Sequence, residues 1–426
     1  MAAVLLAGCS TSSAGTAGNR IDPSGPPPKA NLLVWTDATR QAGFEAYEKK
    51  YKDSGTKLKL TTLPDKFANK ILLATKAKSG WPDVLFDGGT NNVSLFTSKL
   101  YDYAADLTPL LPAGTADKFF SGAIGPCEIN GKLYCLRNDY APNMLWYNTK
   151  LFQQFGYKVP TTYEEYQSLG VKLAAEHPGY SLGAIGGDQE NFYFDGANCN
   201  YGEVAGQTFS IDLKSANCSR AIKLLDTLLT NKTVSPASEF APDFVKDYGS
   251  TDKVLAMVGP IWYGQYLFAG TYKTPAGEMA VSAPLKWAKD SKTYNGTYGG
   301  GVYYVSKHSA NPTAAASLAY WMATSKDFQT TGPTFPAYQP DAAAWLSRAQ
   351  SSGVVSSPNL SSVVNGAAKA VDAKQQAAVN IPSTIDRGWS SQVVPTIANG
   401  RTIASVVDKW QTFMENSAKA AGFQVK

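Results

Sequence analysis

The sequence predicts a fold of two α/β lobes. Its 426 residues are enough for two large domains, and a hydrophobic content of 44% supports a full core in each. Near its start the body alternates strand, helix, strand, helix and strand, which is typical of a parallel sheet with helices on its faces. No Pro- or Gly-rich linker divides the body, so we expect the chain to cross between the lobes more than once.

The first three strands are expected at Leu32–Trp35, Leu58–Leu63 and Val84–Phe86. The first and third are short apolar runs, and the second alternates apolar with polar residues. Between them, residues 44–51 and 67–74 place apolar side chains at helical spacing, which predicts two helices.

The remainder of the body adds a hairpin, further strands and capped helices. Asn130-Gly131 is a strong two-residue hairpin signal. Thr162 and Glu165 match a capping box, and Asn311-Pro312 begins another helix. Further strands are expected at 144–147, 254–258 and 302–305, and a last helix over 403–414 with Gly422 beyond its end.

The N-terminus resembles a bacterial export signal with a lipid-attachment cysteine. Residues 1–7 are apolar, the LAGC sequence that ends at Cys9 resembles a lipobox, and a Ser-, Gly- and Pro-rich tract follows. We therefore expect a signal-peptide remnant at 1–8, lipid on Cys9, and a flexible tether at 9–29. Such a tether spans roughly 25 Å as a random coil and roughly 70 Å at full stretch. These features predict an extracytoplasmic protein, lipid-anchored to the outer face of a bacterial cell membrane. The alternative is a chance LAGC in a disordered N-terminus.

The four remaining cysteines form two local pairs. Cys127 and Cys135 flank the hairpin signal, and Cys199 and Cys218 bracket a second short loop. An even number of cysteines in an extracellular chain favours disulfides, and local pairing is the simplest of the three connectivities. The alternatives are four free buried thiols or a zinc site. The absence of CxxC and the isolation of the two histidines disfavour zinc.

Charge and hydropathy disfavour two classes of partner. The net charge is +5, but basic and acidic residues are mixed, and no Lys/Arg cluster is dense enough for a nucleic-acid-binding face. After the N-terminus, no stretch approaches the roughly 18 unbroken apolar residues of a membrane span. The body is therefore expected to be soluble, with only its N-terminus meeting lipid.

No reactive constellation is evident, so catalysis is not expected. GxSxG, HExxH, P-loop and helix-opening GxGxxG motifs are absent. His177 lies at a predicted helix end and His308 in a polar turn, positions typical of surface histidines. A glycosidase needs two carboxylates across a cleft, and nothing marks such a pair among the 34 acidic residues. Neither a metal nor a cofactor is predicted.

Aromatic and polar residues gather where predicted strands end and in Gly-rich turns. Ligands of open parallel sheets bind at the carboxyl ends of the strands. Aromatic rings stack on the C–H faces of sugars while polar groups bind the hydroxyls, so this combination favours a sugar. The alternative for each residue is an ordinary core aromatic or a solvated surface acid. The candidates are Trp35, Asp37, Asp65, Lys66, Asp87, Glu190 and Tyr193 in an expected loop, Trp262, Tyr263, Arg387 and Trp389.

Six segments together resemble one family. In this order they resemble the extracellular solute-binding proteins of ABC importers, in particular the sugar-binding cluster that includes maltodextrin-binding protein. The resemblance covers Leu32 to Phe423. The segments are LLVWTD from Leu32, GWPDVLFDGG from Gly80, NGKLYCLRNDYAPNMLWYNTKLF from Asn130, AMVGPIWYG from Ala256, GGGVYYVSKHSANPTAAASLAYWMATS from Gly299 and NGRTIASVVDKWQTFM from Asn399.

The resemblance implies a periplasmic-binding-protein-like (venus flytrap) fold, with two lobes joined by a multi-crossing hinge and a ligand in the cleft. It implies lobe 1 at 30–142 plus about 301–340, and lobe 2 at 143–300 plus about 341–426. Crossings are implied near Tyr140–Leu145 and Gly299–Val302, with a return after about Pro340.

The resemblance also distributes the candidate residues between the lobes. It implies a first-lobe side of Trp35, Asp37, Asp65, Lys66 and Asp87, and a second-lobe side of Glu190, Tyr193, Trp262 and either Arg387 or Trp389. Gly299 and Gly300 are implied to let the backbone approach the ligand closely. Where relatives often have GKLYGLP, this chain has Cys135 and Arg137. Cys135 suggests extra stiffness near the hinge, and Arg137 leaves open a ligand with some negative charge.

The implied function is a closing clamp that binds a sugar or oligosaccharide and delivers it to a membrane permease. The implied partners are a carbohydrate ligand, two permease subunits and an ATPase. No nucleic acid and no cofactor is implied, and a monomer is expected. Three other interpretations stay open: a lipid-anchored sugar sensor, a receptor for a polyamine, phosphoester or metal chelate, and a secreted carbohydrate-active enzyme.

Overall fold

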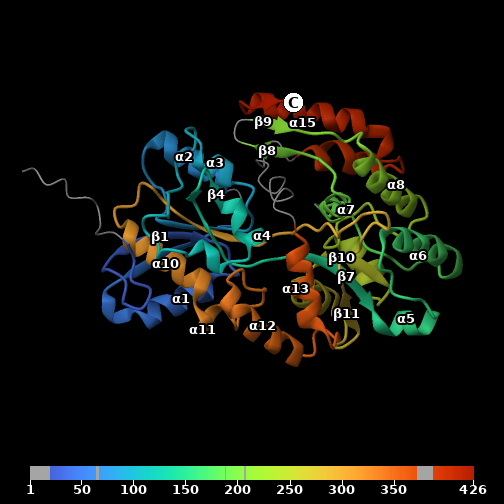
Figure 1. Cartoon of the computed structure of the whole chain (residues 1–426), viewed down its shortest axis with the longest axis horizontal. Helices are drawn as coiled ribbons and strands as arrows, with labels where there is room; N and C mark the ends of the chain where they lie inside the picture. Colours follow the sequence, from blue (N-terminus) through green and yellow to red (C-terminus); the bar gives the residue numbers. More distant parts are fainter. Residues whose placement is uncertain (1–19, 64–66, 188, 206–207, 372–386) are drawn as a thin grey trace, which may run out of the picture.

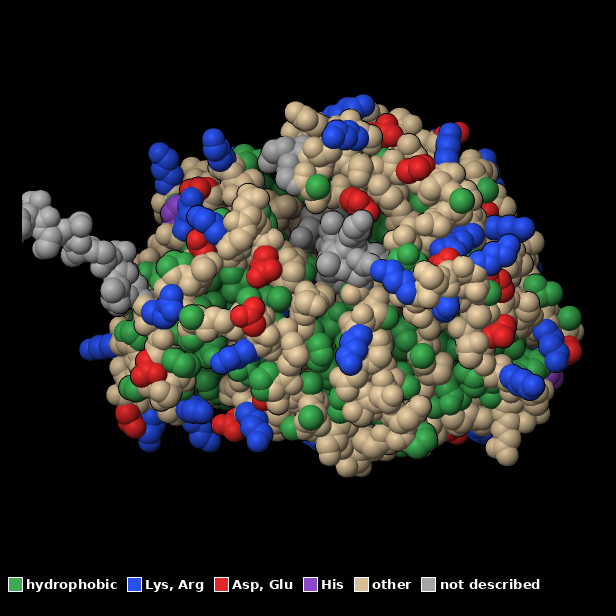
Figure 2. Space-filling view, in the orientation of Figure 1, with side chains coloured by type: hydrophobic (Ala, Val, Ile, Leu, Met, Phe, Trp, Pro, Cys, Tyr) green, Lys and Arg blue, Asp and Glu red, His purple; other side chains and the backbone are tan. Residues whose placement is uncertain are grey.

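The computed structural model describes residues 20–63, 67–187, 189–205, 208–371 and 387–426. Three residues with predicted roles, Cys9, Asp65 and Lys66, lie outside these ranges, as does the predicted signal segment. The described chain forms two α/β lobes that lie side by side, the first on the left of Figure 1 and the second on the right. The predicted fold class is therefore confirmed. On the face drawn in Figure 2, basic and acidic side chains are interspersed.

A five-stranded sheet forms the centre of the first lobe, in the order β2-β1-β3-β12-β6. Its strands are β1 (Asn31–Thr36), β2 (Lys57–Thr62), β3 (Val84–Asp87), β6 (Leu136–Arg137) and β12 (Val302–Val305). β1 pairs in parallel with β2 and β3, as the sequence predicts, whereas β12 pairs antiparallel with β3 and β6. Every residue of β3 and of β12 is buried, which is typical of strands that are covered on both faces.

Helices cover both faces of this sheet. α1 (Gln41–Lys50) and α10 (Pro312–Thr324) pack together on one side, and α2 (Phe67–Ala77) and α3 (Val93–Thr97) lie on the other (Figure 1). A Cβ on Gly43 of α1 would lie 2.6 Å from Phe328 and 2.7 Å from Met322, so glycine permits this close packing. The other helices are α4 (Ser121–Ile124) and α11 (Lys326–Gln329), with 3₁₀ turns at Lys52–Ser54, Ala116–Lys118 and Gly125–Cys127; α12 (Gln339–Ser351) follows α11 and leads toward the second lobe.

A three-stranded antiparallel sheet, in the order β10-β7-β11, forms the centre of the second lobe. Its strands are β7 (Asn143–Asn148), β10 (Ala256–Pro260) and β11 (Met279–Ser282), and α13 (Leu360–Ala370) packs against β7 and β11. The other helices are α5 (Thr149–Phe155), α6 (Tyr163–Glu176), α7 (Glu190–Gly196), α8 (Ala216–Thr230), α9 (Pro242–Phe244), α14 (Val394–Ala398) and α15 (Val407–Ala420), with π-helical segments at Val245–Gly249, Gly264–Tyr272 and Trp389–Val393.

Two small sheets complete the described structure. β8 (Glu203–Ala205), β9 (Thr208–Ser210) and β13 (Gln424–Val425) form one, and the hairpin of β4 (Glu128–Ile129) and β5 (Lys132–Leu133) forms the other. The structure contains both locally paired disulfides that the sequence predicts, Cys127–Cys135 beside this hairpin and Cys199–Cys218.

Local signals in the sequence act as expected at three places. Asn130 and Gly131 both have positive φ, +51° and +73°, as a two-residue hairpin turn requires. Thr162 and Glu165 form a reciprocal capping box at the start of α6. Pro312 occupies the first turn of α10.

Several boundaries differ from the expectation; the strand expected at 254–258, for example, is β10 at Ala256–Pro260. Glu190 and Tyr193 lie in α7 and not in a loop, because this short segment buries Phe192, Tyr193 and Phe194 together against the second lobe. The last helix begins at Val407, because one 3₁₀ turn at Ala404–Val406 precedes it.

The chain passes between the two sheets along paired segments that form a hinge. It leaves the first sheet after β6, enters the second at β7, and returns between β11 and β12. The two passages run antiparallel: Asn143 N donates to Gly296 O and Tyr298 N donates to Ala141 O, each at 3.1 Å. A further passage leads through α12 to α13, and Tyr140 Oη donates to Ala368 O at 2.9 Å.

Within the described ranges, none of the helices combines the length and the hydropathy needed to cross a membrane.

Candidate functional site

A cavity of about 610 Å³ lies beside the hinge and takes its walls from both lobes. Its volume falls within the roughly 300–1,000 Å³ of small-molecule sites. The first lobe contributes Asp37, Thr39, Arg40, Phe86, Asp87, Gly88, Gly89, Thr90, Asn91, Asp139 and Thr334; the second lobe contributes Asn191, Tyr201, Trp262 and Tyr266; the second hinge passage contributes Thr297, Tyr298, Gly299, Gly300 and Gly301.

The turn after β1 brings Asp37 and Arg40 to the cavity. Asp37 Oδ1 accepts hydrogen bonds from Thr39 N at 2.8 Å, Thr39 Oγ1 at 2.7 Å and Arg40 N at 3.2 Å. This carboxylate therefore forms the turn that leads into α1, and it fixes the position of the two residues that follow. Asp37 reaches the cavity because parallel strands end at the same edge of the sheet.

The turn after β3 brings Asp87 and two glycines to the same edge. Asn92 Nδ2 donates to Asp87 Oδ2 at 2.7 Å, and Asp87 is 7% exposed. A Cβ on Gly88 would meet no atom within 4 Å, so the backbone here is open to the cavity. This wall combines a carboxylate with accessible peptide groups, which suits a ligand rich in hydroxyls.

A buried ion pair forms part of the cavity wall. Arg40 Nη2 lies 3.3 Å from Asp139 Oδ1, and both side chains are less than one-tenth exposed. Asp139 Oδ1 also accepts from Asn138 Nδ2 at 2.7 Å and from Gly301 N at 2.9 Å. Burial lowers the pKa of Arg40. The Asp139 carboxylate and the other groups around Arg40 together raise this pKa by more than burial lowers it, so the net shift is upward. Arg40 therefore stays charged and paired.

Arg137 lies behind the cavity and does not line it. The residue is fully buried, its Nε donates to Asp139 O at 3.1 Å, and its Nη2 donates to Gly299 O at 3.0 Å. Burial lowers the pKa of this guanidinium. Arg137 thus holds the two hinge passages together and is not available to a ligand in the cavity.

Two glycines let the second passage run close to Arg137. Gly299 and Gly300 have φ of +78° and +87°, the left-handed region that favours glycine. A Cβ on Gly300 would lie 2.5 Å from Arg137 Nη2 and 2.8 Å from Asp139 O. Their backbone therefore faces the cavity without a side chain in between.

The second-lobe wall is aromatic. Trp262 is half-buried, its Nε1 donates to Tyr298 O at 2.9 Å, and the two rings are 5.7 Å apart with 31° between their planes. Phe240 stacks on Trp262 from outside, at 6.3 Å and 13°. Tyr266 follows Trp262 by about one helical turn and lines the same cavity. Trp262 thus has a fixed orientation with part of its surface exposed.

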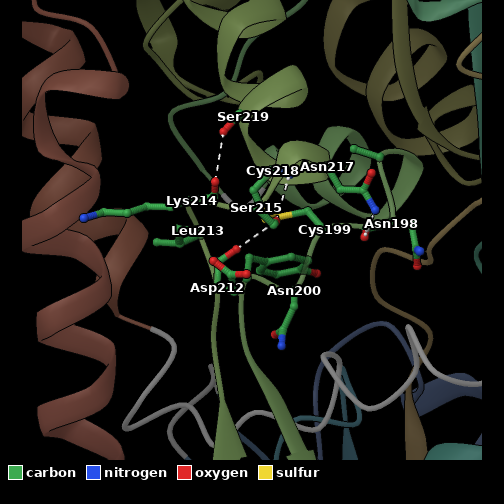
Figure 3. The surroundings of a disulfide bond; sticks show 12 residues. Asn198, Cys199, Asn200, Asp212, Leu213, Lys214, Ser215, Asn217, Cys218 and Ser219 are labelled. Atoms are coloured by element: carbon green, nitrogen blue, oxygen red, sulfur yellow. Dashed lines mark hydrogen bonds between the residues drawn. A yellow bond between two sulfur atoms is a disulfide. The ribbon is translucent and has the colours of Figure 1, made fainter. Parts of the chain in front are cut away.

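A disulfide anchors the segment that carries Tyr201. Cys199 joins the end of α7 to Cys218 in α8, and Asn217 Nδ2 donates to Asn198 O at 3.0 Å (Figure 3). Tyr201 Oη donates to Asp195 Oδ1 at 3.0 Å. Burial raises the pKa of Asp195 to about 7, and the hydrogen bond from Tyr201 opposes this shift.

The sequence of the chain matches one family over most of this architecture. Residues 42–339 match the family described as bacterial extracellular solute-binding protein. The chain belongs to this family. Membership places this solute-binding protein outside the cytoplasm and in a family of binding proteins.

Solved structures of similar fold come from several bacteria. One is an ABC-transporter-associated binding protein of B. animalis subsp. lactis Bl-04 in complex with β-1,6-galactobiose, with 20% identity, coverage of 93% of this chain and 100% of that chain, and a TM-score of 0.74. Another is the galacto-N-biose-/lacto-N-biose I-binding protein of the ABC transporter from Bifidobacterium longum in complex with lacto-N-biose. It has 18% identity, coverage of 94% of this chain and 100% of that chain, and a TM-score of 0.76. A third is the maltose-binding periplasmic protein of Listeria monocytogenes in complex with maltose. It has 18% identity, coverage of 92% of this chain and 98% of that chain, and a TM-score of 0.65. At these identities the likeness establishes the fold. No curated protein matches the sequence.

Five of the residues predicted from the sequence line the cavity of this solute-binding protein. They are Asp37, Asp87, Trp262, Gly299 and Gly300. Asp65 and Lys66 lie outside the described residues.

The other predicted residues lie away from the cavity lining, each for a structural reason. Trp35 is half-buried within β1 and packs against the core. Glu190 and Tyr193 are buried in α7, and Tyr193 lies among the rings of Tyr163 and Tyr166.

The remaining three belong to the core or to the surface of the second lobe. Tyr263 is fully buried and donates to Glu239 Oε1 at 3.0 Å. Trp389 Nε1 donates to Ile185 O at 3.0 Å from the core, and Arg387 is exposed at the surface. None of these three residues lines the cavity.

Sequence reasoning missed several lining residues, chiefly Arg40, Asp139, Tyr201, Tyr266 and Tyr298. Two of them carried a usable signal. Arg40 follows Asp37 by three residues at the start of a helix, and Tyr266 follows Trp262 by four. The other three reach the cavity only through the pairing of the hinge segments and the disulfide-linked loop.

In the part of the chain that the structure describes, no group of three or more His, Cys, Asp or Glu side chains could hold a metal ion.

Proposed function

We propose that this solute-binding protein captures a sugar or oligosaccharide in the interlobe cavity and delivers it to the membrane permease of an ABC importer. One observation carries the proposal. A single cavity has an oriented aromatic wall, Trp262 with Tyr298, opposite a polar wall that contains Asp37 and Asp87.

The chemistry of the two walls suits a saccharide. An aromatic ring packs against the apolar C–H face of a sugar, and carboxylates and backbone groups accept hydrogen bonds from its hydroxyls. Trp262 lines the cavity and its indole N–H already donates to Tyr298 O, so the ring and not the N–H is left for contact with a ligand. The sugars in the galactobiose, lacto-N-biose and maltose complexes of similar fold support the same ligand class.

The paired hinge passages support a closing clamp. The cavity takes residues from both lobes, so contacts made on both walls exist only when the lobes are close together. A ligand that makes such contacts shifts the population toward the closed form. The closed form is then the one that the permease binds.

We also propose lobe limits and a membrane anchor. The limits are 30–142 plus about 301–340 for the first lobe and 143–300 plus about 341–426 for the second. Membership of β6 and β12 in one sheet, and of β7 and β11 in the other, supports them. The LAGC sequence at Cys9 and the polar tract behind it support an export signal and lipid attachment. We propose a monomer that binds without catalysis and needs no cofactor.

A thermal-shift screen of the purified protein against mono- and oligosaccharides tests the proposal. A ligand at one hundred times its dissociation constant adds about 2.7 kcal/mol to the free energy of unfolding, which raises the melting temperature measurably. We expect Trp262→Ala to abolish the shift. Trp81→Ala is the matched control, because Trp81 is a half-buried tryptophan that stacks on His308 away from the cavity. A shift with amines or phosphoesters and none with any saccharide would overturn the sugar assignment.

A further inference from the structure

Resting on the proposed function, we propose that the cavity selects saccharides without negative charge and discriminates against those that bear a carboxylate or a phosphate. The selection comes from the charged groups of the cavity wall. An anionic ligand group needs a cation or a set of free N–H donors in place of its water.

Arg40 is the one basic side chain among the described residues that line the cavity, and it already has a counter-ion. Its Nη2 lies 3.3 Å from Asp139 Oδ1, and its Nη1 donates to Thr39 Oγ1 at 2.9 Å. A ligand carboxylate that recruited Arg40 would take the counter-ion from the Asp139 carboxylate, which is 3% exposed, and leave it only the hydrogen bonds from Asn138 Nδ2 and Gly301 N. Breaking a buried pair in this way is costly.

The second guanidinium near the cavity is not available either. Arg137 donates from Nε to Asp139 O and from Nη2 to Gly299 O, both backbone carbonyls of the hinge. It is fully buried and does not line the cavity. The positive charge that the sequence places at this position therefore serves the hinge.

The rest of the polar wall is of the wrong sign for an anion. Asp37 and Asp87 line the cavity from the ends of β1 and β3. A ligand carboxylate between these groups meets like charge in a site partly removed from water, which raises its free energy.

Two hydroxyls in the wall favour a ligand with hydroxyl groups. Thr90 and Thr297 both line the cavity, both are at least nine-tenths buried, and the Oγ1 atom of each has no hydrogen-bond partner among the described residues. A buried hydroxyl without a partner is costly, and a neutral sugar hydroxyl can both donate to it and accept from it. A ligand carboxylate can also accept from these hydroxyls, so the discrimination against anions comes from the Arg40–Asp139 pair and from Asp37 and Asp87.

Titration calorimetry on the full chain with matched saccharides tests the selection. The neutral probes are glucose, galactose, maltose, lactose and galactobiose. Each is compared with an amino form and a uronate form of the same sugar. We expect every uronate to bind about tenfold or more weakly than its neutral counterpart, while the amino form retains binding. Asp139→Asn removes the counter-ion of Arg40. We therefore expect it to reduce the ratio of the uronate and neutral-sugar dissociation constants about tenfold or more.

Two further variants keep the result decisive. Asp87→Asn removes a wall charge at the end of β3 and is expected to narrow the difference in affinity between uronate and neutral sugar even if Asp139→Asn fails to fold. Asp327→Asn removes an exposed surface charge, 80% exposed and outside the cavity, and should leave this difference as it is. A uronate that binds wild type as tightly as its neutral counterpart overturns the selection but leaves the proposed function standing. If no saccharide of any charge binds, the proposed function fails, and the selection fails with it.

Discussion

Replacing Gly300 with alanine tests whether the second hinge passage requires a residue without a side chain. Gly300 has a φ of +87°, where an L-residue costs about 1–2 kcal/mol. Its Cβ would lie 2.5 Å from Arg137 Nη2 and 2.8 Å from Asp139 O. Arg137 is fully buried and the second contact is backbone, so neither can move away freely, and overpacking adds about 1–3 kcal/mol. We expect the free energy of unfolding to fall by about 2–5 kcal/mol.

Equilibrium unfolding in guanidinium chloride measures this loss, and two other glycines separate its causes. Gly277 has a φ of +84° but no atom within 4 Å of a Cβ, so Gly277→Ala reports backbone strain alone, about 1–2 kcal/mol. Gly88 has neither a left-handed φ nor a close neighbour, so Gly88→Ala should change stability by less than about 0.5 kcal/mol. If Gly300→Ala unfolds at the same denaturant concentration as Gly277→Ala, the reasoning about the crowded hinge is refuted.

Three further predictions concern the second lobe. Burial raises the pKa of Asp195 from 3.8 to about 7, so between these values the folded state keeps a proton that the unfolded state loses. The free energy of unfolding should therefore fall by up to about 4 kcal/mol as pH rises from about 4 to about 7. Asp195→Asn should flatten this decline in urea titrations across that range; an unchanged slope would contradict the assignment. Removing Cys199–Cys218 by serine substitution should lower the free energy of unfolding by about 3 kcal/mol and weaken sugar binding. Removing Cys127–Cys135 should lower it by slightly less, about 2.5 kcal/mol, and leave the affinity unchanged. Equal affinities in the two variants would show that Cys199–Cys218 does not position Tyr201. Arg220 donates from both Nη atoms to Asp290 at 2.7 and 2.8 Å. Arg220→Lys should lose this bidentate pair and about 1–2 kcal/mol of stability, measured by thermal unfolding. A variant as stable as wild type would show that the bidentate pair does not stabilise the fold.

The parts of the fold that local chemistry determines could be predicted from the sequence. The Asn130-Gly131 turn, the capping box at Thr162 and the helix start at Pro312 each depend on a few adjacent residues, and the structure has all three. Asp37 and Asp87 could be predicted as neighbours because parallel strands end at one edge of a sheet. This reasoning needs only the order of strands and helices.

The rest of the cavity depends on contacts between residues far apart in the chain. Asp139 meets Arg40 across about one hundred residues, and it does so because β6 is placed beside β12. Trp262 and Tyr263 are adjacent in sequence, yet the first lines the cavity and the second is fully buried against Glu239. A sequence pattern identifies both as aromatic and cannot tell which one faces the ligand.

The same residues form the cavity wall and the hinge, and this links ligand binding to lobe closure. Asp139 belongs to the first passage, holds Arg40 in the cavity wall and accepts from Gly301 N in the second passage. Arg137 joins the two passages again through the carbonyl groups of Asp139 and Gly299. Of these contacts, the hydrogen bond from Arg137 to Gly299 joins the first lobe to the second passage, so a change in the angle between the lobes acts on it and on the Gly299 backbone beside the cavity. A ligand that touches these groups therefore favours one hinge geometry through its contacts alone, and no separate signal between site and hinge is needed.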